Sequence, residues 1–375
     1  MDVAALRALF PALEGQLYFN FAGVAPTSTR VAAAARAFLD DLVQNGIRNE
    51  AGWERSAEAT RSAAARIVGA TPGEIALVRN TSHGLGLVAE GLPWHEGDEV
   101  AVCTALEYPS NVYPWLHLAD RGVKVREVAP RDGGVSVEAV AAACTPRTKL
   151  VAVSSAQYAT GVPTDLPALG AWCRAHDVLL CVDGIQTVGC VPVDVKAAGV
   201  HFLAADSHKW MMGVPGVGFL FVDEAVLPRL RPVLVGWKST TDAWNFDRAH
   251  FELRTDAAKL EEGSPSYALV AGMGAALELL LEVGVDAIAA RVAGHVERLV
   301  TGLARLGCEV TPAHAPRVGI VTFVPREGSA KALHERLVAA GASVSLRRGR
   351  IRVSPSFLNT EEEIDRLLAL VAENQ

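Results

Sequence analysis

Short apolar runs and amphipathic stretches alternate along the chain from about residue 75 onward. The apolar runs are rich in β-branched residues and predict strands, and the amphipathic stretches between them, such as residues 110–121 and 166–176, predict helices. This alternation is typical of an α/β protein with a mainly parallel sheet wrapped by helices. Seven strands are expected in the sheet: Ile75–Arg79, Glu99–Thr104, Lys124–Val128, Leu150–Ser154, Leu179–Asp183, Phe202–Ala205 and Gly218–Val222.

The pattern changes on both sides of this region. Two amphipathic helices are expected before the sheet, over residues 27–45 and 50–69, and a loop rich in Trp, Asp and Arg follows it at 237–254. The elements expected after the loop are a long helix (267–306), short strands near 308–312 and 319–324, a helix (329–340), a strand pair around 344–353 and a last helix from Thr360.

These elements predict a division of the chain into domains. We expect a large domain over residues 21–264 and a smaller α+β domain over residues 265–375. An N-terminal segment, residues 1–20, is expected to pack with the smaller domain.

Composition narrows the classes of partner. Half of the 375 residues are hydrophobic, so the chain can bury a large core, and the formal net charge is -7 with no stripe of Lys or Arg. A small-molecule substrate is therefore expected, rather than nucleic acid or a membrane. The six cysteines show no metal-ligand spacing, so no metal site is expected. The N-terminus lacks a secretory signal pattern, and we expect a cytoplasmic protein.

Two charged residues stand at the ends of neighbouring predicted strands. Asp183 ends one strand, and Lys209 follows the next in the segment Asp206-Ser207-His208-Lys209-Trp210. Ligands of open α/β sheets collect at this edge. An Asp in this place is about as often a helix N-cap, and a lone Lys usually extends to solvent. Lys209 is nevertheless one of only seven lysines, and the others begin strands or lie on predicted helices and loops.

This pair suits the chemistry of pyridoxal phosphate (PLP). A lysine amine that forms a Schiff base with a carbonyl must be deprotonated and partly desolvated, which a confined site beside another cation such as His208 favours. The pyridine nitrogen needs an acidic partner that keeps it protonated, so that the ring accepts electrons from the substrate Cα. Lys209 is therefore the predicted catalytic residue, and Asp183 is the predicted partner of the ring.

Two further segments follow strands and suit the same ligand. Asn80–Leu85 starts a helix, where free N–H groups and the hydroxyls of Thr81 and Ser82 favour a phosphate, although either hydroxyl is equally explained as an N-cap. Tyr108 could lie on a flat ring, although a surface or core position is commoner for Tyr. Neither segment identifies a cofactor by itself.

Together these motifs resemble the class V aminotransferases, which are PLP enzymes of fold type I and include cysteine desulfurases, selenocysteine lyases, isopenicillin-N-epimerase-like proteins and kynureninases. The strongest parts are Val182-Asp183-Gly184-Ile185-Gln186, similar to the family's VDGAQ segment, and Ser207-His208-Lys209-Trp210, similar to its lysine motif. The resemblance runs from Tyr18 to the last helix and implies the same two-domain fold.

The resemblance implies roles around the cofactor ring. Lys209 would carry PLP, Asp183 would meet the pyridine nitrogen, and Gln186 would donate a hydrogen bond to the 3-oxygen. Tyr108 stands where desulfurases usually have a stacking His, and Gln157-Tyr158 matches the loop beside the ring, with Gln157 as the expected contact.

It also implies roles at the phosphate. Thr81, Ser82 and His208 would hold it, and Asp206 stands where many relatives have a Ser near it. An anion there would repel the phosphate unless Asp206 binds a hydroxyl or His208 instead. Ser264, in a segment similar to the family's FEAGTP loop, would reach the phosphate of a neighbouring subunit and so require a homodimer with shared active sites.

The substrate side rests on two segments. Asn20 and Ala22 lie in a segment that resembles the one lining the family's substrate pocket. Arg352 stands where the family holds the arginine that binds the substrate carboxylate, and a planar guanidinium suits a bidentate grip on it. Three nearby arginines leave this choice open: Arg347, Arg348 and Arg350.

The reaction class stays open between related activities. Desulfurases that store sulfur as a persulfide carry a loop cysteine before the carboxylate-binding arginine, and residues 343–349 contain none. We expect an aminotransferase acting on a small α-amino acid, with C–S lyase chemistry on cysteine-like substrates as the close second and epimerisation as a further option. A non-catalytic binding protein on the same scaffold is disfavoured because Lys209, Asp183 and Gln186 are all present.

Overall fold

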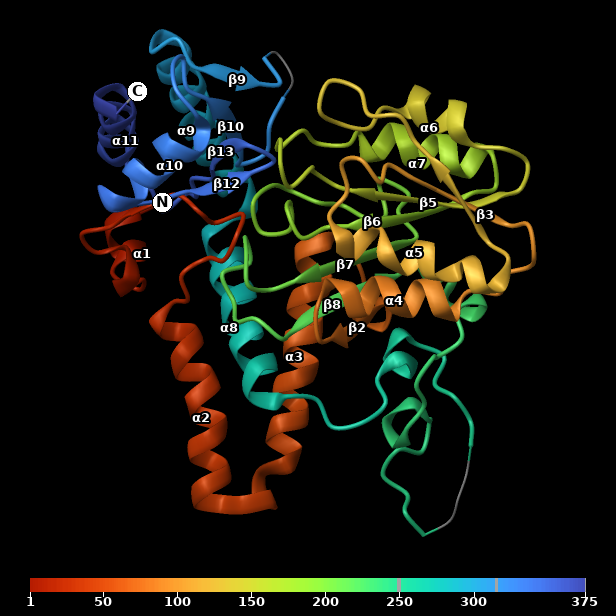
Figure 1. The fold of residues 1–375 in the computed structure, drawn as a ribbon. Helices are drawn as coiled ribbons and strands as arrows, with labels where there is room; N and C mark the ends of the chain where they lie inside the picture. The colour runs from red at the N-terminus through yellow and green to blue at the C-terminus, as the bar shows by residue number, and fades with distance from the viewer. Residues whose placement is uncertain (248–250, 314–315, 375) are drawn as a thin grey trace.

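A seven-stranded sheet forms the centre of the larger part of the molecule (Figure 1). The computed structural model describes residues 1–247, 251–313 and 316–374. The strand order is β2-β8-β7-β6-β5-β3-β4; β8 is antiparallel to both of its neighbours, and the other adjacent pairs are parallel. The predicted mainly parallel sheet is therefore confirmed. Its strands are β2 (Ile75–Val78), β3 (Glu99–Val102), β4 (Lys124–Glu127), β5 (Thr148–Ser154), β6 (Leu179–Asp183), β7 (Phe202–Asp206) and β8 (Gly218–Val222).

Helices cover both faces of the sheet because its central strands are apolar on both sides. In β7, Phe202 and Ala204 face a core formed with α4 (Thr81–Gly91) and α5 (Tyr113–His117), whereas Leu203 and Ala205 face the opposite core. This alternation follows from the two-residue period of a strand. The opposite core contains residues of α3 (Glu50–Val68), α7 (Leu166–Ala175) and α8 (Tyr267–Val283). The structure also has a short helix, α6 (Val137–Ala143), that was not predicted from the sequence.

Two predicted helices differ from the structure. The expected helix 110–121 is a short α5 between 3₁₀ turns, because Pro109 and Pro114 supply no backbone N–H to a continuous helix. The expected single helix 267–306 is two helices, α8 and α9 (Val285–Arg305). They are separated by Gly284, whose φ of 87° lies in the region that favours glycine. The break turns the chain away from the sheet.

The C-terminal part contains its own four-stranded antiparallel sheet, with strand order β12-β13-β10-β9. β12 and β13 form the strand pair expected near residues 344–353, and the helices α9, α10 and α11 complete this part. The remaining elements are β9 (Glu309–Thr311), β10 (Val321–Val324), α10 (Ala330–Ala339), β11 (Ala342–Ser343), β12 (Ser345–Arg347), β13 (Arg350–Val353) and α11 (Glu361–Asn374).

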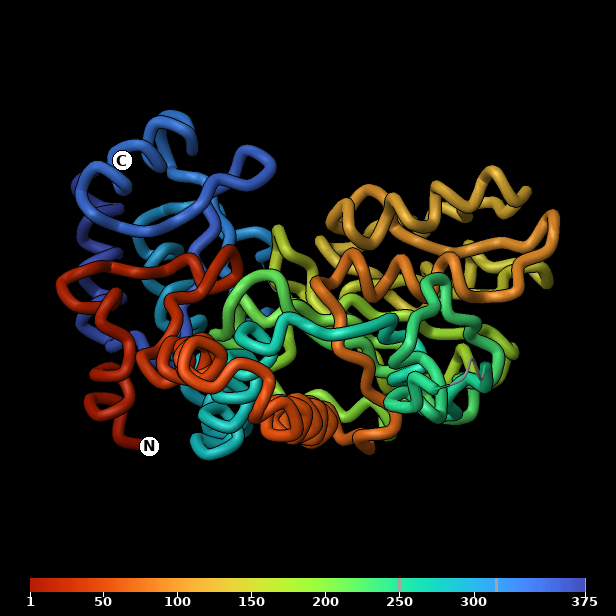
Figure 2. The backbone as a smooth tube through the Cα atoms, turned by 90° about the horizontal axis from the view of Figure 1, so that it is seen from below, coloured from red at the N-terminus to blue at the C-terminus, as the bar shows by residue number. Residues whose placement is uncertain are grey.

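The N-terminal segment lies against this C-terminal part, as Figures 1 and 2 show. β1 (Leu17–Tyr18) pairs in parallel with β11, and the Arg7 guanidinium of the short helix α1 (Val3–Arg7) lies 2.7 Å from the Glu363 carboxylate. The limits of the three domains stay a prediction.

Two segments extend from the main layers. α2 (Thr29–Asn45) and α3 form a hairpin that packs on α8 and whose far end extends beyond the sheet (Figure 1). The predicted loop 237–254 includes residues 248–250, which lie outside the described residues, and its described part contains a short 3₁₀ helix at Trp237–Ser239. No helix in the described ranges is by itself long and apolar enough to cross a membrane; α8 and α9 meet those criteria only as a pair bent by 79°.

Candidate active site

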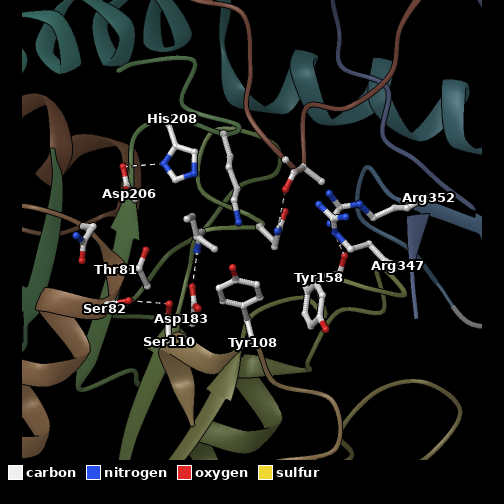
Figure 3. Close-up of a pocket in the computed structure, with 16 residues that line it drawn as sticks. Thr81, Ser82, Tyr108, Ser110, Tyr158, Asp183, Asp206, His208, Arg347 and Arg352 are labelled. Atoms are coloured by element: carbon white, nitrogen blue, oxygen red, sulfur yellow. Dashed lines mark hydrogen bonds and ion pairs between the residues drawn. The ribbon is translucent and has the colours of Figure 1, made fainter. Parts of the chain in front are cut away.

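A cavity of about 210 Å³ opens at the carboxyl edge of the large sheet (Figure 3). This is the edge at which open α/β sheets bind ligands. The ends of β6 and β7, the start of α4 and the β12–β13 hairpin all contribute to its wall. The lining residues are Ala22, Gly23, Asn80, Thr81, Ser82, Tyr108, Ser110, Tyr158, Asp183, Ile185, Gln186, Asp206, His208, Lys209, Arg347 and Arg352.

Asp183 lies on the cavity wall at the end of β6. Its side chain is buried, and Oδ1 accepts a hydrogen bond from the Ile185 backbone N–H at 3.0 Å. Burial raises the pKa of this carboxyl to about 7, and the positive charge of Lys209 opposes the rise. A cation placed beside Asp183 would therefore hold it in the ionised form.

Lys209 follows β7 and reaches into the same cavity. Burial, helped by the positive charges of Arg352 and Arg347 and opposed by Asp183, lowers the pKa of its amine to about 8. The amine Nζ lies 5.8 Å from the centroid of the Tyr108 ring. With this pKa about one amine in ten is unprotonated at pH 7, far more than for an ordinary lysine, and that form is available as a nucleophile or base.

The start of α4 forms the end of the cavity that lies away from Arg352 and Arg347 (Figure 3). Asn80 caps the helix, because its side chain accepts from the His83 backbone N–H at 2.8 Å. The Thr81 hydroxyl is therefore not needed as the cap, and its Oγ1 is buried without a hydrogen-bond partner among the described residues. Ser82 Oγ donates to Ser110 Oγ at 2.7 Å. Hydroxyls and the N-terminus of a helix together suit an anion.

α4 comes close to the sheet because Gly84 has no side chain. A Cβ at this position would lie 2.9 Å from the Cβ of Ala204 in β7. The close contact brings the start of α4 beside the end of β7, where Asp206 and His208 are located. Asp206 Oδ1 lies 2.9 Å from His208 Nδ1, so the sequence-level expectation that Asp206 needs a partner such as His208 agrees with the geometry.

Arg352 enters the cavity from β13 and is held by three segments. It donates to the Tyr158 carbonyl at 2.8 Å, to Ser345 Oγ at 3.2 Å and to Asn20 Oδ1 at 3.4 Å. Burial lowers its pKa to about 10, with a further contribution from Arg347. Asn20 itself does not line the cavity, whereas Ala22, two residues later, does.

The structure separates the four neighbouring arginines. Of the other three, only Arg347 lines the cavity. Its Nη1 donates to the Leu346 carbonyl at 2.9 Å, and it has no ion pair with a described carboxylate. Arg348 bonds to Tyr158 and Ala105, and Arg350 lies 3.2 Å from Glu309. Two guanidinium groups therefore face the cavity without a carboxylate partner in the described parts of the chain.

Of the two glutamines expected beside the cofactor ring, Gln186 lines the cavity and Gln157 does not. Gln186 lines the cavity, with its amide between the Ala22 carbonyl at 3.3 Å and the Trp210 indole N–H at 2.9 Å. Gln157 is buried but does not line the cavity, and its Nε2 donates to Glu107 at 2.9 Å. The neighbouring Tyr158 lines it instead, with its ring 5.2 Å from that of Tyr108.

Sequence reasoning did not single out Ser110, and it placed Tyr158 in the loop beside the ring but took Gln157 as the contact. Ser110 lies two residues after Tyr108 and Tyr158 directly follows Gln157, and only the local turn decides which member of a loop points inward. Ser264 lies elsewhere, in a second cavity with Arg79, His83 and Glu262. It is not brought to Lys209 within one chain.

With this geometry established, comparison with known proteins assigns the family. The sequence description of the family Aminotransferase class-V matches residues 17–367, so the chain belongs to the class V aminotransferases. These are enzymes that use pyridoxal phosphate, as the motifs around Asp183 and Lys209 predicted.

Individual relatives point to sulfur chemistry as well as to amino-group transfer. A probable cysteine desulfurase of Methanothermobacter thermautotrophicus is 30% identical and covers 98% of this chain and 96% of its own length. An uncharacterized aminotransferase of Bacillus subtilis, YcbU, is 28% identical over 96% of this chain and 94% of its own.

Solved structures agree with the fold. A C-DES variant with glycine covalently linked to its PLP cofactor has a TM-score of 0.91 at 27% identity and covers 98% of this chain and 99% of its own. The cystine C–S lyase C-DES with its product cysteine persulfide also has a TM-score of 0.91, at 28% identity over 97% of this chain and 99% of its own. The predicted fold type is therefore confirmed.

Proposed function

We propose that this protein is a PLP-dependent C–S lyase acting on an α-amino acid that carries sulfur at Cβ and a second carboxylate beyond it. The observation that carries the proposal is the pair of guanidinium groups, Arg352 and Arg347, beside Lys209 in a cavity that no cysteine lines among the described residues. One guanidinium suits the α-carboxylate and the other suits a distal carboxylate. Cystine has this chemistry, and two similar structures are of C-DES, named a cystine C–S lyase.

Three side chains of the cavity have properties that suit the functional groups of PLP. Lys209 has a lowered pKa, Asp183 is a carboxyl whose pKa is raised by burial, and Thr81 Oγ1 is a buried hydroxyl without a partner among the described residues. An aldehyde, a protonated pyridine nitrogen and a phosphate would satisfy them in turn.

Each residue then has a defined task. PLP, when bound, supplies a conjugated ring that withdraws electrons from the substrate Cα. Asp183 would hold a proton at the pyridine nitrogen, and Gln186 would donate toward the 3-oxygen. Lys209 Nζ would carry the cofactor and, once the substrate has replaced it there, would accept the proton of the substrate Cα. Tyr108 would cover the ring, and Thr81, Ser82 and His208 would hold the phosphate.

Arg352 orients the substrate so that the Cα proton faces Lys209. When that proton leaves, the Cβ–S bond breaks and its electron pair departs on sulfur. Hydrolysis of the released three-carbon enamine gives pyruvate and ammonia, and for cystine the sulfur leaves as cysteine persulfide. No cysteine of the enzyme is needed to receive sulfur in this reaction.

Amino-group transfer is the second candidate, because the family includes aminotransferases such as the Bacillus subtilis relative. The two differ in their need for a keto-acid acceptor. We expect the PLP-loaded protein to form pyruvate and persulfide sulfur from cystine without an acceptor, and to form less pyruvate, with methanethiol as the sulfur product, from S-methylcysteine, which lacks the distal carboxylate. Amino transfer to a keto acid, with no pyruvate from cystine or cysteine, would replace the lyase assignment.

We also propose a homodimer in which Ser264 of one subunit contacts the phosphate bound by the other. Its separate cavity in the single chain supports a role outside its own active site. One chain has a mass of 39.6 kDa, and sedimentation should give twice this value. Two results together would contradict the shared site: a monomeric mass in solution, and a Ser264→Ala variant that binds PLP as tightly as the wild type does.

A further inference from the structure

Asp206 is an unexpected residue at the end of a cavity that suits a phosphate. It ends β7, is buried, and lines the cavity together with Thr81 and Ser82 at the start of α4. A free carboxylate in this place would repel a phosphate, because two anions in a desolvated site raise each other's free energy. Its presence therefore calls for a cation between the two.

His208 is in position to be that cation. Its Nδ1 lies 2.9 Å from Asp206 Oδ1, an ion-pair distance, and neither atom has a hydrogen-bond partner in the parts of the chain that the structure describes, so a small rotation of the ring would align the two. Figure 3 shows the imidazole ring beside Asp206 on the cavity wall, near Thr81. A carboxylate at Nδ1 favours a hydrogen on that nitrogen and fixes the orientation of the ring. Nε2 is then left for a second partner.

We propose that Asp206 is a positioning residue that holds His208 as a charged hydrogen-bond donor to the phosphate of PLP. The inference rests on the proposed function, because it requires the phosphate at the start of α4. Fully ionised phosphate oxygens only accept hydrogen bonds, so Nε2 must carry a hydrogen in addition to Nδ1. The ring then carries one positive charge between two anions, and both of its hydrogen bonds are charge-assisted.

Two roles of Asp206 predict opposite effects of one substitution. If Asp206 positions and charges His208, Asp206→Asn weakens PLP binding. If Asp206 acts only as an anion near the phosphate, the same variant tightens it. Asp206→Ser, which introduces the residue found in many relatives, removes the charge in a second way and serves if the Asn variant is poorly folded.

The test measures the PLP dissociation constant of the apoenzyme by spectroscopic titration for Asp206→Asn, His208→Gln and the double variant. We expect each single variant to raise the constant on the order of tenfold, and the double variant to be no weaker than His208→Gln, because both changes remove one interaction. Unchanged or tighter binding in Asp206→Asn, or additive effects in the double variant, would overturn the inference.

Pyridoxal without its phosphate is the matched control ligand. Its binding should be the same in wild type and Asp206→Asn, because the contact is lost with the phosphate. An equal loss for pyridoxal and PLP would show a general structural defect and would also overturn the inference. A wild-type protein that does not bind PLP would instead refute the proposed function, so the two failures are distinguishable.

Discussion

Arg352 Nη2 lies 3.4 Å from Asn20 Oδ1, although 332 residues separate the two in the chain. The contact follows from the N-terminal segment running beside β13, where Asn20 forms a bridge with Ser354. Arg352 also bonds to the Tyr158 carbonyl of the large sheet's edge. One guanidinium thus joins three distant segments, which fixes its direction into the cavity.

Arg352→Lys should raise KM for the amino acid by about 10- to 100-fold, because an ammonium cannot grip a carboxylate in the bidentate way that a guanidinium does. Steady-state kinetics with cystine would measure the change. PLP absorption should stay as in wild type, since Arg352 is proposed to contact the substrate. A wild-type KM would remove Arg352 from the substrate site.

Lys209→Ala should abolish the visible absorption that the wild-type protein acquires with PLP, because no other amine lines the cavity among the described residues. Absorption spectra after removal of free PLP would measure this. The matched control is Lys149→Ala, a change at an exposed lysine of β5, which should retain the band. Persistence of the band in Lys209→Ala would place the cofactor elsewhere.

Arg347→Ala should reduce kcat/KM for cystine by about tenfold and leave that for S-methylcysteine nearly unchanged, because only cystine offers a distal carboxylate. Arg350→Ala is the control on the same hairpin: its guanidinium lies beside Glu309 and outside the cavity. Equal losses for both substrates would assign Arg347 a general role instead of a role in substrate selection.

The rate of PLP uptake by the apoenzyme should rise with pH and level off above about 8, the pKa of Lys209. The sign follows because only the unprotonated amine attacks the aldehyde, and this form increases as pH passes the pKa. Arg347→Ala removes a nearby positive charge, which makes the ammonium form easier to keep and moves the pKa and the profile upward. Stopped-flow absorption measurements of PLP uptake at a series of pH values would compare the two profiles. A profile of Arg347→Ala that coincides with that of the wild type would contradict the prediction.

Glu261→Gln should lower the free energy of unfolding by ~3–5 kcal/mol, because it removes the buried counter-charge of the Arg61 guanidinium and leaves only the exposed Glu58 carboxylate at 3.2 Å. Glu261 Oε1 lies 2.5 Å from Arg61 Nη1 and also accepts from the Leu77 backbone N–H at 2.8 Å. Asp365→Asn, at an exposed pair with Arg298, is the control and should cost less than about 1 kcal/mol. Denaturant unfolding curves of both variants provide the comparison.

Local patterns accounted for most of the fold and for the chemistry at the strand ends. Apolar runs marked the seven strands; Asp183 ends one of them, and Lys209 follows three residues after the end of the next. Helix limits were less accessible: Gly284 inside an otherwise continuous helical pattern did not indicate that α8 ends there. An isolated glycine is tolerated in many helices, and the break here is decided by packing of α9 on the small sheet.

The sequence by itself determined the sheet, the family motifs and the places of Lys209 and Asp183 at neighbouring strand ends, because strand periodicity and the residues at strand ends are local properties. The tertiary structure alone decided which arginine beside Arg352 faces the cavity, that Tyr158 and not Gln157 lines it, and that Asp206 meets His208. These depend on the pairing of β12 with β13 and on loop conformations. Both are set by contacts between segments far apart in the chain, which no local pattern records.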